Sequence, residues 1–285
     1  MTENKEAFAY CEKLARSHYE NFTVGSLFVP KILRRHLYSV YAFCRWSDDL
    51  GDETGDPVRA YRLLEDWENQ LNACYEGKAS HPIYQALQET ISEFHLPKDP
   101  FWRLIQAFKQ DQIKTRYQTF TELLEYCQNS ANPVGHLVLY LFGYQDKKRQ
   151  ELSDMTCTAL QLANFWQDVA VDLLKGRIYI PREDMERFGV LESDLHLNQG
   201  TKNFKELMAF EVDRTRDMFL KGLELVKLVK GVLKIDLKAF TKGGLAVLDG
   251  IQKMDYDVLL KRPVVSRRLK LKILIEALAS LPFSA

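Results

Sequence analysis

Apolar residues recur along most of this chain at spacings of three and four positions, which is the period of an amphipathic helix. Strand-like alternation bounded by turn signals is scarce. The pattern predicts helical segments at residues 5–20, 31–50, 57–76, 82–94, 101–113, 120–142, 148–174, 203–229, 235–253 and 266–280. We therefore predict an all-α protein.

Prolines support this division of the chain, because most of them fall between the predicted segments, where helices begin and end. They are Pro30, Pro57, Pro82, Pro97, Pro100, Pro181 and Pro263. No linker, internal repeat or low-complexity tract separates the segments. Residues 1–285 are therefore predicted to form a single domain.

Pro133 is an exception, since it lies inside the predicted 120–142 segment, where a proline kinks a helix. Its small neighbours, Ser130, Ala131 and Gly135, leave room beside the backbone. Two interpretations stay open. The kink serves packing, or it widens the wall of a site for a bulky apolar ligand.

Two polar stripes interrupt the apolar background. With 3.6 residues per turn, each stripe occupies one narrow face of a helix. The first consists of Tyr41, Arg45, Asp48 and Asp52, and the second of Gln161, Asn164, Asp168 and Asp172. Aspartates four residues apart destabilise an isolated helix, and buried carboxylates without a partner are costly. Oxygen ligands suit Mg²⁺, which commonly bridges to substrate phosphates, so we predict a Mg²⁺-dependent enzyme that acts on a diphosphate.

The neighbours of these aspartates extend the predicted site. Asn164 adds a neutral oxygen ligand, whereas Asp49 and Glu53 project to another face and are not expected among the ligands. Arg45 either forms an ion pair with the aspartates or binds the diphosphate through its planar fork. Behind the second stripe we expect a loop that returns cationic and hydroxyl groups toward the metal; these are Lys175, Arg177 and Tyr179.

Aromatic residues near the stripes indicate how the site could handle a cation once the diphosphate has left. Ionising an allylic or cyclopropylcarbinyl diphosphate leaves a carbocation, which water would quench. A dry pocket lined by aromatic faces can stabilise such a cation. The candidates are Phe22, Tyr41, Phe43, Tyr126 and Phe165, and each of them is equally compatible with a place in the core.

The composition excludes several other classes of protein. Lys plus Arg and Asp plus Glu both number 39, so there is no basic footprint for nucleic acid. The 5 dispersed cysteines indicate reduced thiols rather than disulfides or structural zinc. No P-loop and no Ser–His–Asp arrangement is present. Without a signal peptide or a spanning segment, the protein is expected to be cytoplasmic.

The C-terminal segment allows contact with the inner membrane surface. Basic residues alternate there with apolar ones, as in helices that lie on anionic lipid. They are Arg267, Arg268, Lys270 and Lys272. The alternative is an ordinary terminal helix that docks on the core.

These motifs, taken in order, resemble the squalene/phytoene synthase family over about residues 15 to 270. Asp48-Asp49-x-x-Asp52 resembles its first aspartate-rich motif, and Gln161-x-x-Asn164-x-x-x-Asp168-x-x-x-Asp172 its second, with Arg177-x-Tyr179 next in the chain. The resemblance implies an isoprenoid-synthase helical fold around a central cavity and Mg²⁺ ions that bind the diphosphate. It also implies residues near the diphosphate or the lipid chain: His18, Phe22, Tyr41, Arg45, Asp111 and Tyr126.

Within this family, three stretches look most like bacterial hydroxysqualene synthases of hopanoid pathways. They are His18-Tyr-Glu-Asn-Phe22, Ser130-Ala-Asn-Pro-Val-Gly135 and Asn164-Phe-Trp-Gln-Asp168-Val. Such an enzyme ionises presqualene diphosphate and lets water capture the rearranged cation, with no nicotinamide cofactor. Tyr19 and Asn21 stand where phytoene and dehydrosqualene synthases tend to carry small hydroxylated residues. The alternatives are a condensing synthase that makes presqualene diphosphate, dehydrosqualene, squalene or phytoene, and a non-catalytic relative that binds lipid or assembles other proteins.

Overall fold

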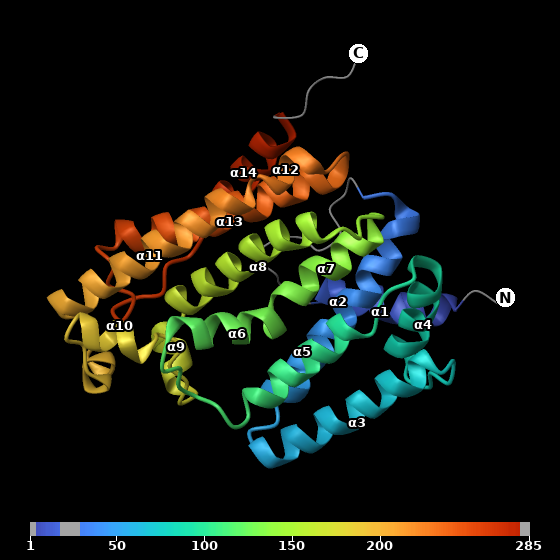
Figure 1. The fold of residues 1–285 in the computed structure, drawn as a ribbon, viewed down its shortest axis with the longest axis horizontal. Helices are drawn as coiled ribbons and strands as arrows, with labels where there is room; N and C mark the ends of the chain where they lie inside the picture. The colour runs from blue at the N-terminus through green and yellow to red at the C-terminus, as the bar shows by residue number, and fades with distance from the viewer. Residues whose placement is uncertain (1–3, 18–28, 280–285) are drawn as a thin grey trace. The chain divides into compact units, whose positions relative to one another are not determined.

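The computed structural model describes residues 4–17 and 29–279, which form helices and connecting segments (Figure 1). The protein is 75% helical, and the described residues contain no strand. The predicted all-α class is therefore confirmed. The predicted substrate-binding residues His18 and Phe22 lie outside the described residues.

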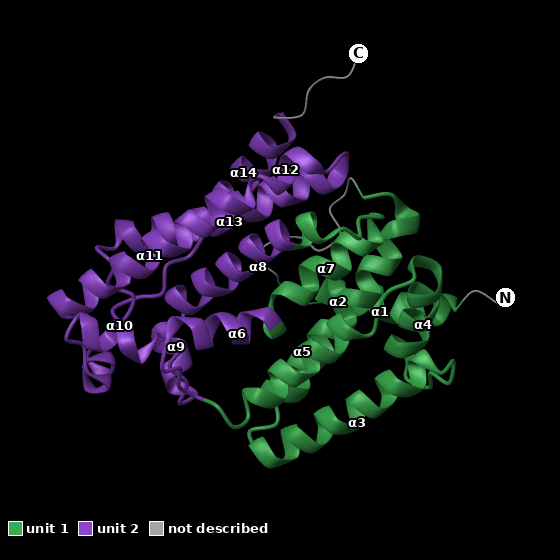
Figure 2. Ribbon diagram, in the orientation of Figure 1, with its two compact units in different colours: residues 1–114, 129–150 green, residues 115–128, 151–285 purple. Residues whose placement is uncertain are grey.

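The chain divides into two compact units (Figure 2). Unit 1 comprises residues 1–114 and 129–150, and unit 2 comprises residues 115–128 and 151–285. The first predicted aspartate stripe belongs to unit 1 and the second to unit 2. A single domain over residues 1–285 stays a prediction.

The described residues of unit 1 form six complete helices, which are α1 (Lys5–Ser17), α2 (Lys31–Asp52), α3 (Pro57–Tyr75), α4 (Pro82–Phe94), α5 (Asp99–Gln110) and α7 (Asn132–Leu141). Local sequence explains where they begin. At α3, for example, the side chain of Asp56 accepts hydrogen bonds from the backbone N–H groups of Val58 and Arg59, at 2.9 and 3.3 Å. Pro57 follows at the first helical position, where its missing N–H costs nothing.

Large aromatic side chains fill the core of unit 1. Phe43 of α2 lies with its ring centroid 6.0 Å from Trp67 of α3 and 5.0 Å from Phe101 of α5. The indole of Trp67 donates to Ser47 Oγ at 2.9 Å, so its polar group is satisfied in the interior. This packing fixes one face of α2 and leaves the face of the first aspartate stripe on the other side.

Unit 2 contains α9 (Val169–Leu174), α10 (Arg182–Arg187), the 3₁₀ helix η1 (Glu192–His196), α11 (Lys202–Gly222), α12 (Leu225–Leu228), α13 (Val232–Lys253) and α14 (Arg267–Ala279). It also holds most of α6 (Phe120–Ser130) and α8 (Lys147–Gln167). Helices α11 and α13 pack closely. A Cβ atom at Gly244 would lie 2.1 Å from the ring of Phe219, so only glycine allows this approach.

Three predicted helices are not continuous, which corrects the sequence analysis. The 120–142 segment breaks at Ala131, because Pro133 lacks the N–H that a continuing helix needs and takes the first turn of α7. The 148–174 segment breaks at Asp168, and the 203–229 segment at the end of α11. Helices α10 and η1 were not predicted, since they are too short to show a helical period.

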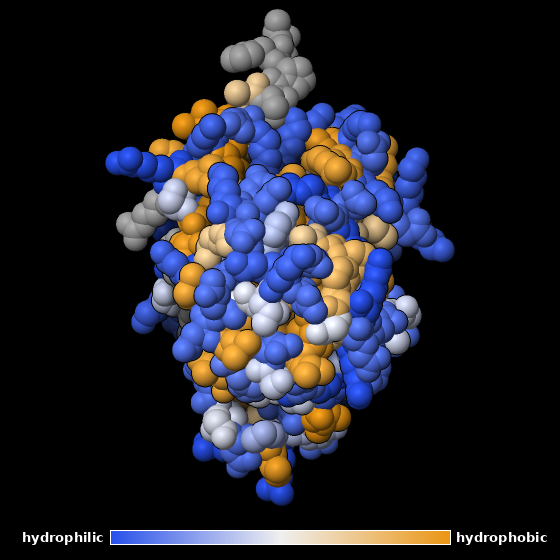
Figure 3. All heavy atoms as spheres, turned by 90° about the vertical axis from the view of Figure 1, so that its left-hand side faces the viewer, coloured by the Kyte–Doolittle hydropathy of each residue, from blue (hydrophilic) through white to orange (hydrophobic). Residues whose placement is uncertain are grey.

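Two general expectations can be checked at this level. None of the five cysteines, all of which lie in the described residues, is joined by a disulfide. No helix in the described part of the chain is long and apolar enough to cross a bilayer. On the face shown in Figure 3, hydrophobic residues form small patches within a largely hydrophilic surface.

Candidate active site

The first aspartate stripe lies on α2, as the sequence predicts. Phe43 and Ser47 of this helix are buried, whereas Tyr41, Arg45 and Asp48 are half-buried and Asp52, at the last helical position, is exposed. The structure thus places all four predicted residues of this stripe along one side of a well-packed helix.

Arg45 is the electrostatic centre of this stripe. Its guanidinium lies 3.1 Å from Asp48 Oδ2 and 2.5 Å from Asp49 Oδ1. Burial opposes the positive charge, but Asp48 and Asp49 outweigh it and raise the pKa of Arg45 above its ordinary value. Asp49, which is not expected among the metal ligands, thus holds the arginine together with Asp48.

One N–H group of Arg45 makes no hydrogen bond to any described residue. Its Nε atom is buried and has no hydrogen-bond partner within the described structure. Burying an N–H without an acceptor is unfavourable, and a guanidinium is suited to bind an oxyanion through two of its N–H groups. The observation fits the predicted role of Arg45 as a ligand of a diphosphate.

Asp111 lies at the end of α5, within the same unit. It is buried, and its backbone N–H donates to the carbonyl of Ala107 at 3.0 Å. The adjacent Gln112 approaches the last turn of α2, where its Nε2 atom would be 3.4 Å from a Cβ atom at Gly51. The end of α5 therefore lies beside the aspartate end of α2.

The second aspartate stripe spans the break between α8 and α9. Asp168 itself is not helical, with φ −109° and ψ 15°. Its N–H still bonds to the carbonyl of Asn164 at 2.9 Å, and its carbonyl accepts from Asp172 at 2.8 Å. The helical register therefore continues across the break, so Asn164, Asp168 and Asp172 keep a common face. Asn164 is exposed, and Gln161 is half-buried one turn earlier.

Arg262 binds Asp168 and was missed by the sequence analysis. It contacts both carboxylate oxygens, with Nη2 3.0 Å from Oδ2 and Nε donating to Oδ1. This bond, together with the charges of Asp168 and Asp172, raises the pKa of Arg262 above its ordinary value. Gln167 fixes the same segment by donating to the carbonyl of Pro263 at 2.5 Å. No motif around Arg262 signals this role, because the contact joins residues that are distant in sequence.

The turn after α9 places Arg177 next to the end of the second stripe. The N–H of Arg177 bonds to the carbonyl of Asp172 at 2.9 Å, and Gly176 allows the turn with φ +73°. Asp172, Arg177 and Tyr179 line one small cavity together with Phe165. Lys175, also expected to point at the metal, is exposed in this turn.

Tyr126, a predicted cation-stabilising aromatic residue, and Tyr179, whose hydroxyl group is expected near the metal, belong to one aromatic cluster in unit 2. The rings of Phe165 and Tyr179 stack with centroids 3.8 Å apart and an interplanar angle of 8°. Tyr126 lies 6.1 Å from Phe165 and 5.9 Å from Tyr179. Tyr117, which the sequence analysis did not single out, stacks on Tyr179 at 5.8 Å. The cluster offers aromatic faces next to the cavity that Asp172 and Arg177 line.

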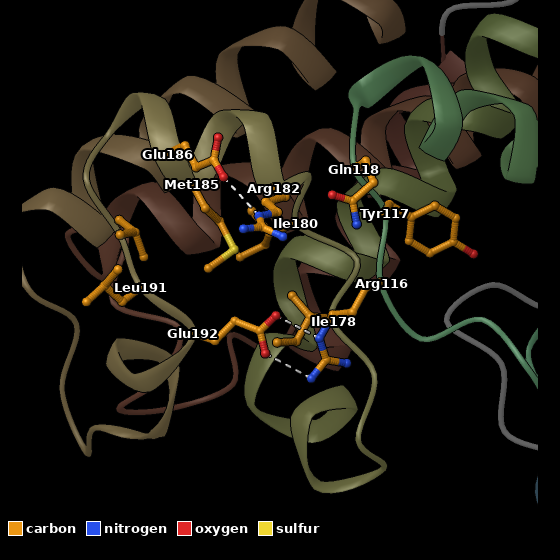
Figure 4. Close-up of a pocket in the computed structure, with 11 residues that line it drawn as sticks. Arg116, Tyr117, Gln118, Ile178, Ile180, Arg182, Met185, Glu186, Leu191 and Glu192 are labelled. Carbon is orange, nitrogen blue, oxygen red and sulfur yellow. Dashed lines mark hydrogen bonds and ion pairs between the residues drawn. The ribbon is translucent and has the colours of Figure 1, made fainter.

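A larger pocket of about 380 Å³ opens beside the 178–182 segment (Figure 4). Ile178 and Ile180 line this pocket together with Met185, and both also border the small cavity that Tyr179 lines. At its rim Arg116 pairs with Glu192 through two hydrogen bonds of 3.0 and 3.1 Å (Figure 4).

The donor sets of both stripes fit Mg²⁺. Among the described residues, no three His, Cys, Asp or Glu side chains come together as a ready-made metal site. Mg²⁺, however, is usually bound by one or two carboxylates, waters and substrate phosphates rather than by a complete protein cage. Each stripe offers two carboxylates on one face, and Arg262 already balances the charge of the second pair.

Comparisons with known proteins agree with these features. The family model for squalene/phytoene synthase matches residues 15–270. The 15-cis-phytoene synthase of Synechocystis sp. is 29% identical over 279 residues, which cover 94% of this chain and 83% of that protein.

Solved structures agree as well. The squalene synthase HpnC of Alicyclobacillus acidocaldarius superposes with a TM-score of 0.84 and 47% identity, covering 90% of this chain and 97% of HpnC. A dehydrosqualene synthase in complex with ligand has a TM-score of 0.88 and 27% identity, covering 97% of this chain and 96% of that one. The fold, the two aspartate-rich segments and the extent of the family match lead to one conclusion: the chain belongs to the squalene/phytoene synthase family.

Proposed function

We propose that this protein converts presqualene diphosphate to hydroxysqualene and diphosphate in a Mg²⁺-dependent reaction. The C–O bond to the diphosphate breaks heterolytically, and its electron pair leaves with the diphosphate. The cyclopropane ring opens, a water molecule attacks the resulting cation, and a proton is released. The reaction consumes no nicotinamide cofactor.

The proposal is supported by 47% identity to the squalene synthase HpnC, against 27% to a dehydrosqualene synthase and 29% to a phytoene synthase, together with the three stretches that look like hydroxysqualene synthases. Family membership alone supports only a head-to-head isoprenoid synthase. The second candidate is therefore a condensing synthase that joins two prenyl diphosphates, favoured by the phytoene synthases among the relatives.

Arg45 and the aspartates of α2 are proposed to hold the diphosphate. The buried Nε of Arg45 would donate to a phosphate oxygen, while Asp48 and Asp52 would bind Mg²⁺. Asn164, Asp168 and Asp172 are proposed as the second group of Mg²⁺ ligands, and Arg177 as a further donor to the diphosphate. When bound, Mg²⁺ neutralises negative charge on the leaving diphosphate.

Tyr126, Phe165 and Tyr179 are proposed to stabilise the carbocation after the diphosphate departs. Their rings form a compact cluster, and aromatic faces attract a cation most strongly where water is excluded. Tyr41 is proposed to contribute from α2, on the same side of the helix as Arg45.

Purified protein tested on each diphosphate in turn separates the two candidates. With presqualene diphosphate and MgCl₂ we expect hydroxysqualene by gas chromatography with mass spectrometry, and no product in EDTA. In H₂¹⁸O the product should gain the heavy oxygen, since water supplies its hydroxyl group. Turnover of farnesyl diphosphate, with none of presqualene diphosphate, would assign the protein to the condensing synthases instead.

A further inference from the structure

The last helix of the protein has two faces of different character. Its inner face docks on α13, where Ile273 and Ala277 pack against Ile235 and Ala239. The inner face is therefore docked on the core, which was one of the two possibilities that the sequence allowed. Its outer face is unlike that of an ordinary surface helix.

The outer face carries Arg268, Leu271, Lys272 and Ile275, which recur at the spacing of a single helical stripe. Leu271 is 59% exposed and Ile275 is 56% exposed, so the two aliphatic side chains stand in solvent next to the two basic ones. Scattered exposed aliphatic residues are normal. Here Leu271 and Ile275 lie in one stripe with Arg268 and Lys272, so aliphatic and cationic groups are exposed together, as contact with a lipid interface requires.

The segment before α14 also exposes aliphatic and basic side chains. Leu260 is 65% exposed and Val264 is 74% exposed, and Lys261 lies between them. Arg262 of the same segment turns the other way, to Asp168. The exposed aliphatic residues are therefore attached to a segment that is anchored at the second aspartate stripe.

Charge around this surface is strongly one-sided, although the whole chain is neutral. Residues 227–285 contain 12 Lys and Arg but only 5 Asp and Glu. Lys234, Lys238 and Lys242 follow one another along α13 at intervals of four, and burial together with the charges of Lys234 and Lys242 lowers the pKa of Lys238. Lys242 also meets Glu276 of α14 at 2.6 Å, which places this lysine row against the last helix.

We propose that the outer face of α14 and residues 260–264 form a docking surface for an anionic lipid bilayer. Leu260, Val264, Leu271 and Ile275 would enter the headgroup region, and the basic residues would contact the lipid phosphates. We favour a bilayer over an acidic protein partner because the exposed apolar side chains are all aliphatic, whereas the apolar anchors of protein interfaces are mainly aromatic and residues 260–279 contain no aromatic residue. The proposal is independent of the reaction that the protein catalyses.

Vesicle sedimentation tests the surface with the full chain. We expect the protein to bind phosphatidylcholine vesicles that contain about 30% phosphatidylglycerol and to be released by about 0.5 M NaCl, as electrostatic binding requires. Binding to phosphatidylcholine alone should be weak. Failure to bind the anionic vesicles at low salt would overturn the proposal.

Two double variants separate the contributions of the surface. The first removes aliphatic area (Leu271→Ser/Ile275→Ser) and the second removes positive charge (Arg268→Gln/Lys272→Gln). Each should weaken binding to anionic vesicles about tenfold. For the charge variant, a basic residue near an anionic surface strengthens binding about fivefold, and the effect of Lys272 is reduced because it already contacts Glu276. The matched controls are Val58→Ser, at another exposed aliphatic position, and Lys31→Gln. Binding of both double variants at the wild-type level, with an unchanged melting temperature, would contradict the proposal. A concentration-dependent dimer that only the Leu271→Ser/Ile275→Ser variant loses would assign the surface to self-association instead.

Discussion

Arg262 and Asp168, from the segment before α14 and the break between α8 and α9, form a bidentate ion pair in unit 2, with Nη2 3.0 Å from Oδ2. The guanidinium also lies in the field of Asp172, whose charge adds to that of Asp168 in raising the pKa of Arg262. One cation therefore balances two like charges four residues apart. A metal ion bound to these carboxylates would neutralise their negative charge in place of Arg262.

The first prediction concerns this exchange of cations. In EDTA, Arg262→Gln should lower the melting temperature by about 2 °C, because Asp168 and Asp172 repel each other without it and a half-exposed pair contributes about 0.5–1 kcal/mol. Saturating Mg²⁺ should reduce the difference, since the metal ion replaces the missing charge. Differential scanning calorimetry with and without Mg²⁺ measures both effects.

Arg216→Gln is the matched control, because Arg216 pairs with Asp249 at 2.9 Å on the surface of the same unit. Its effect on the melting temperature should not depend on Mg²⁺. An Arg262→Gln protein that loses as much stability in Mg²⁺ as in EDTA would separate Arg262 from the metal site.

The second prediction concerns the planar guanidinium group of Arg45 and its several N–H donors. Arg45→Lys keeps one positive charge but cannot contact Asp48 and Asp49 while also offering a third donor to the diphosphate. We expect kcat/KM to fall on the order of a hundredfold, with little change in stability. Steady-state kinetics on the accepted diphosphate checks this, and Arg103→Lys, which alters a similar surface pair with Asp99, should have wild-type activity.

The sequence predicted the elements of the fold well, because helical periodicity reports local burial. The stripe on α2 follows directly from that period, and the start of α3 follows from Pro57 at its first position. The break at Asp168 escaped prediction. Its backbone hydrogen bonds keep helical register, so the residues around it show an unbroken helical pattern.

The sequence predicted the site residues that lie within the two motifs, but not those that lie outside them. Asp168, Asp172 and Arg177 lie within 10 residues of one another, so spacing alone indicated their association. Arg262 and Tyr117 join them through the tertiary fold. A single basic or aromatic residue far away in the chain carries no local signal of such a contact.

The third prediction concerns the stack of Tyr179 on Phe165. Replacing Tyr179 with leucine removes an aromatic face, which contributes about 2 kcal/mol to a cation in a dry site, so kcat should fall about thirtyfold. Tyr179→Phe keeps the ring and should lose much less. Phe188→Leu, which alters a ring pair with Phe210 outside the cluster, is the control. Equal losses in Tyr179→Phe and Tyr179→Leu would assign the effect to the hydroxyl group rather than to the ring.

The last prediction concerns the buried carboxylate of Glu211 on α11. Burial raises its pKa from 4.5 to about 8, although Arg214, at 2.5 Å, acts in the opposite direction and also binds Asp184. The folded state therefore holds a proton that the unfolded chain releases above about pH 4.5, so this group's contribution to stability is lost as pH rises toward 8.

Glu211→Gln should remove this dependence, because glutamine keeps the shape of the side chain and never ionises. Between pH 5 and pH 8 we expect its free energy of unfolding to fall by about 1–3 kcal/mol less than that of the wild-type protein. Urea denaturation at a series of pH values measures the difference. Glu206→Gln, at an exposed position of the same helix, should follow the wild-type curve. Parallel curves for Glu211→Gln and the wild-type protein would mean that Glu211 is already ionised in the folded state, held by Arg214.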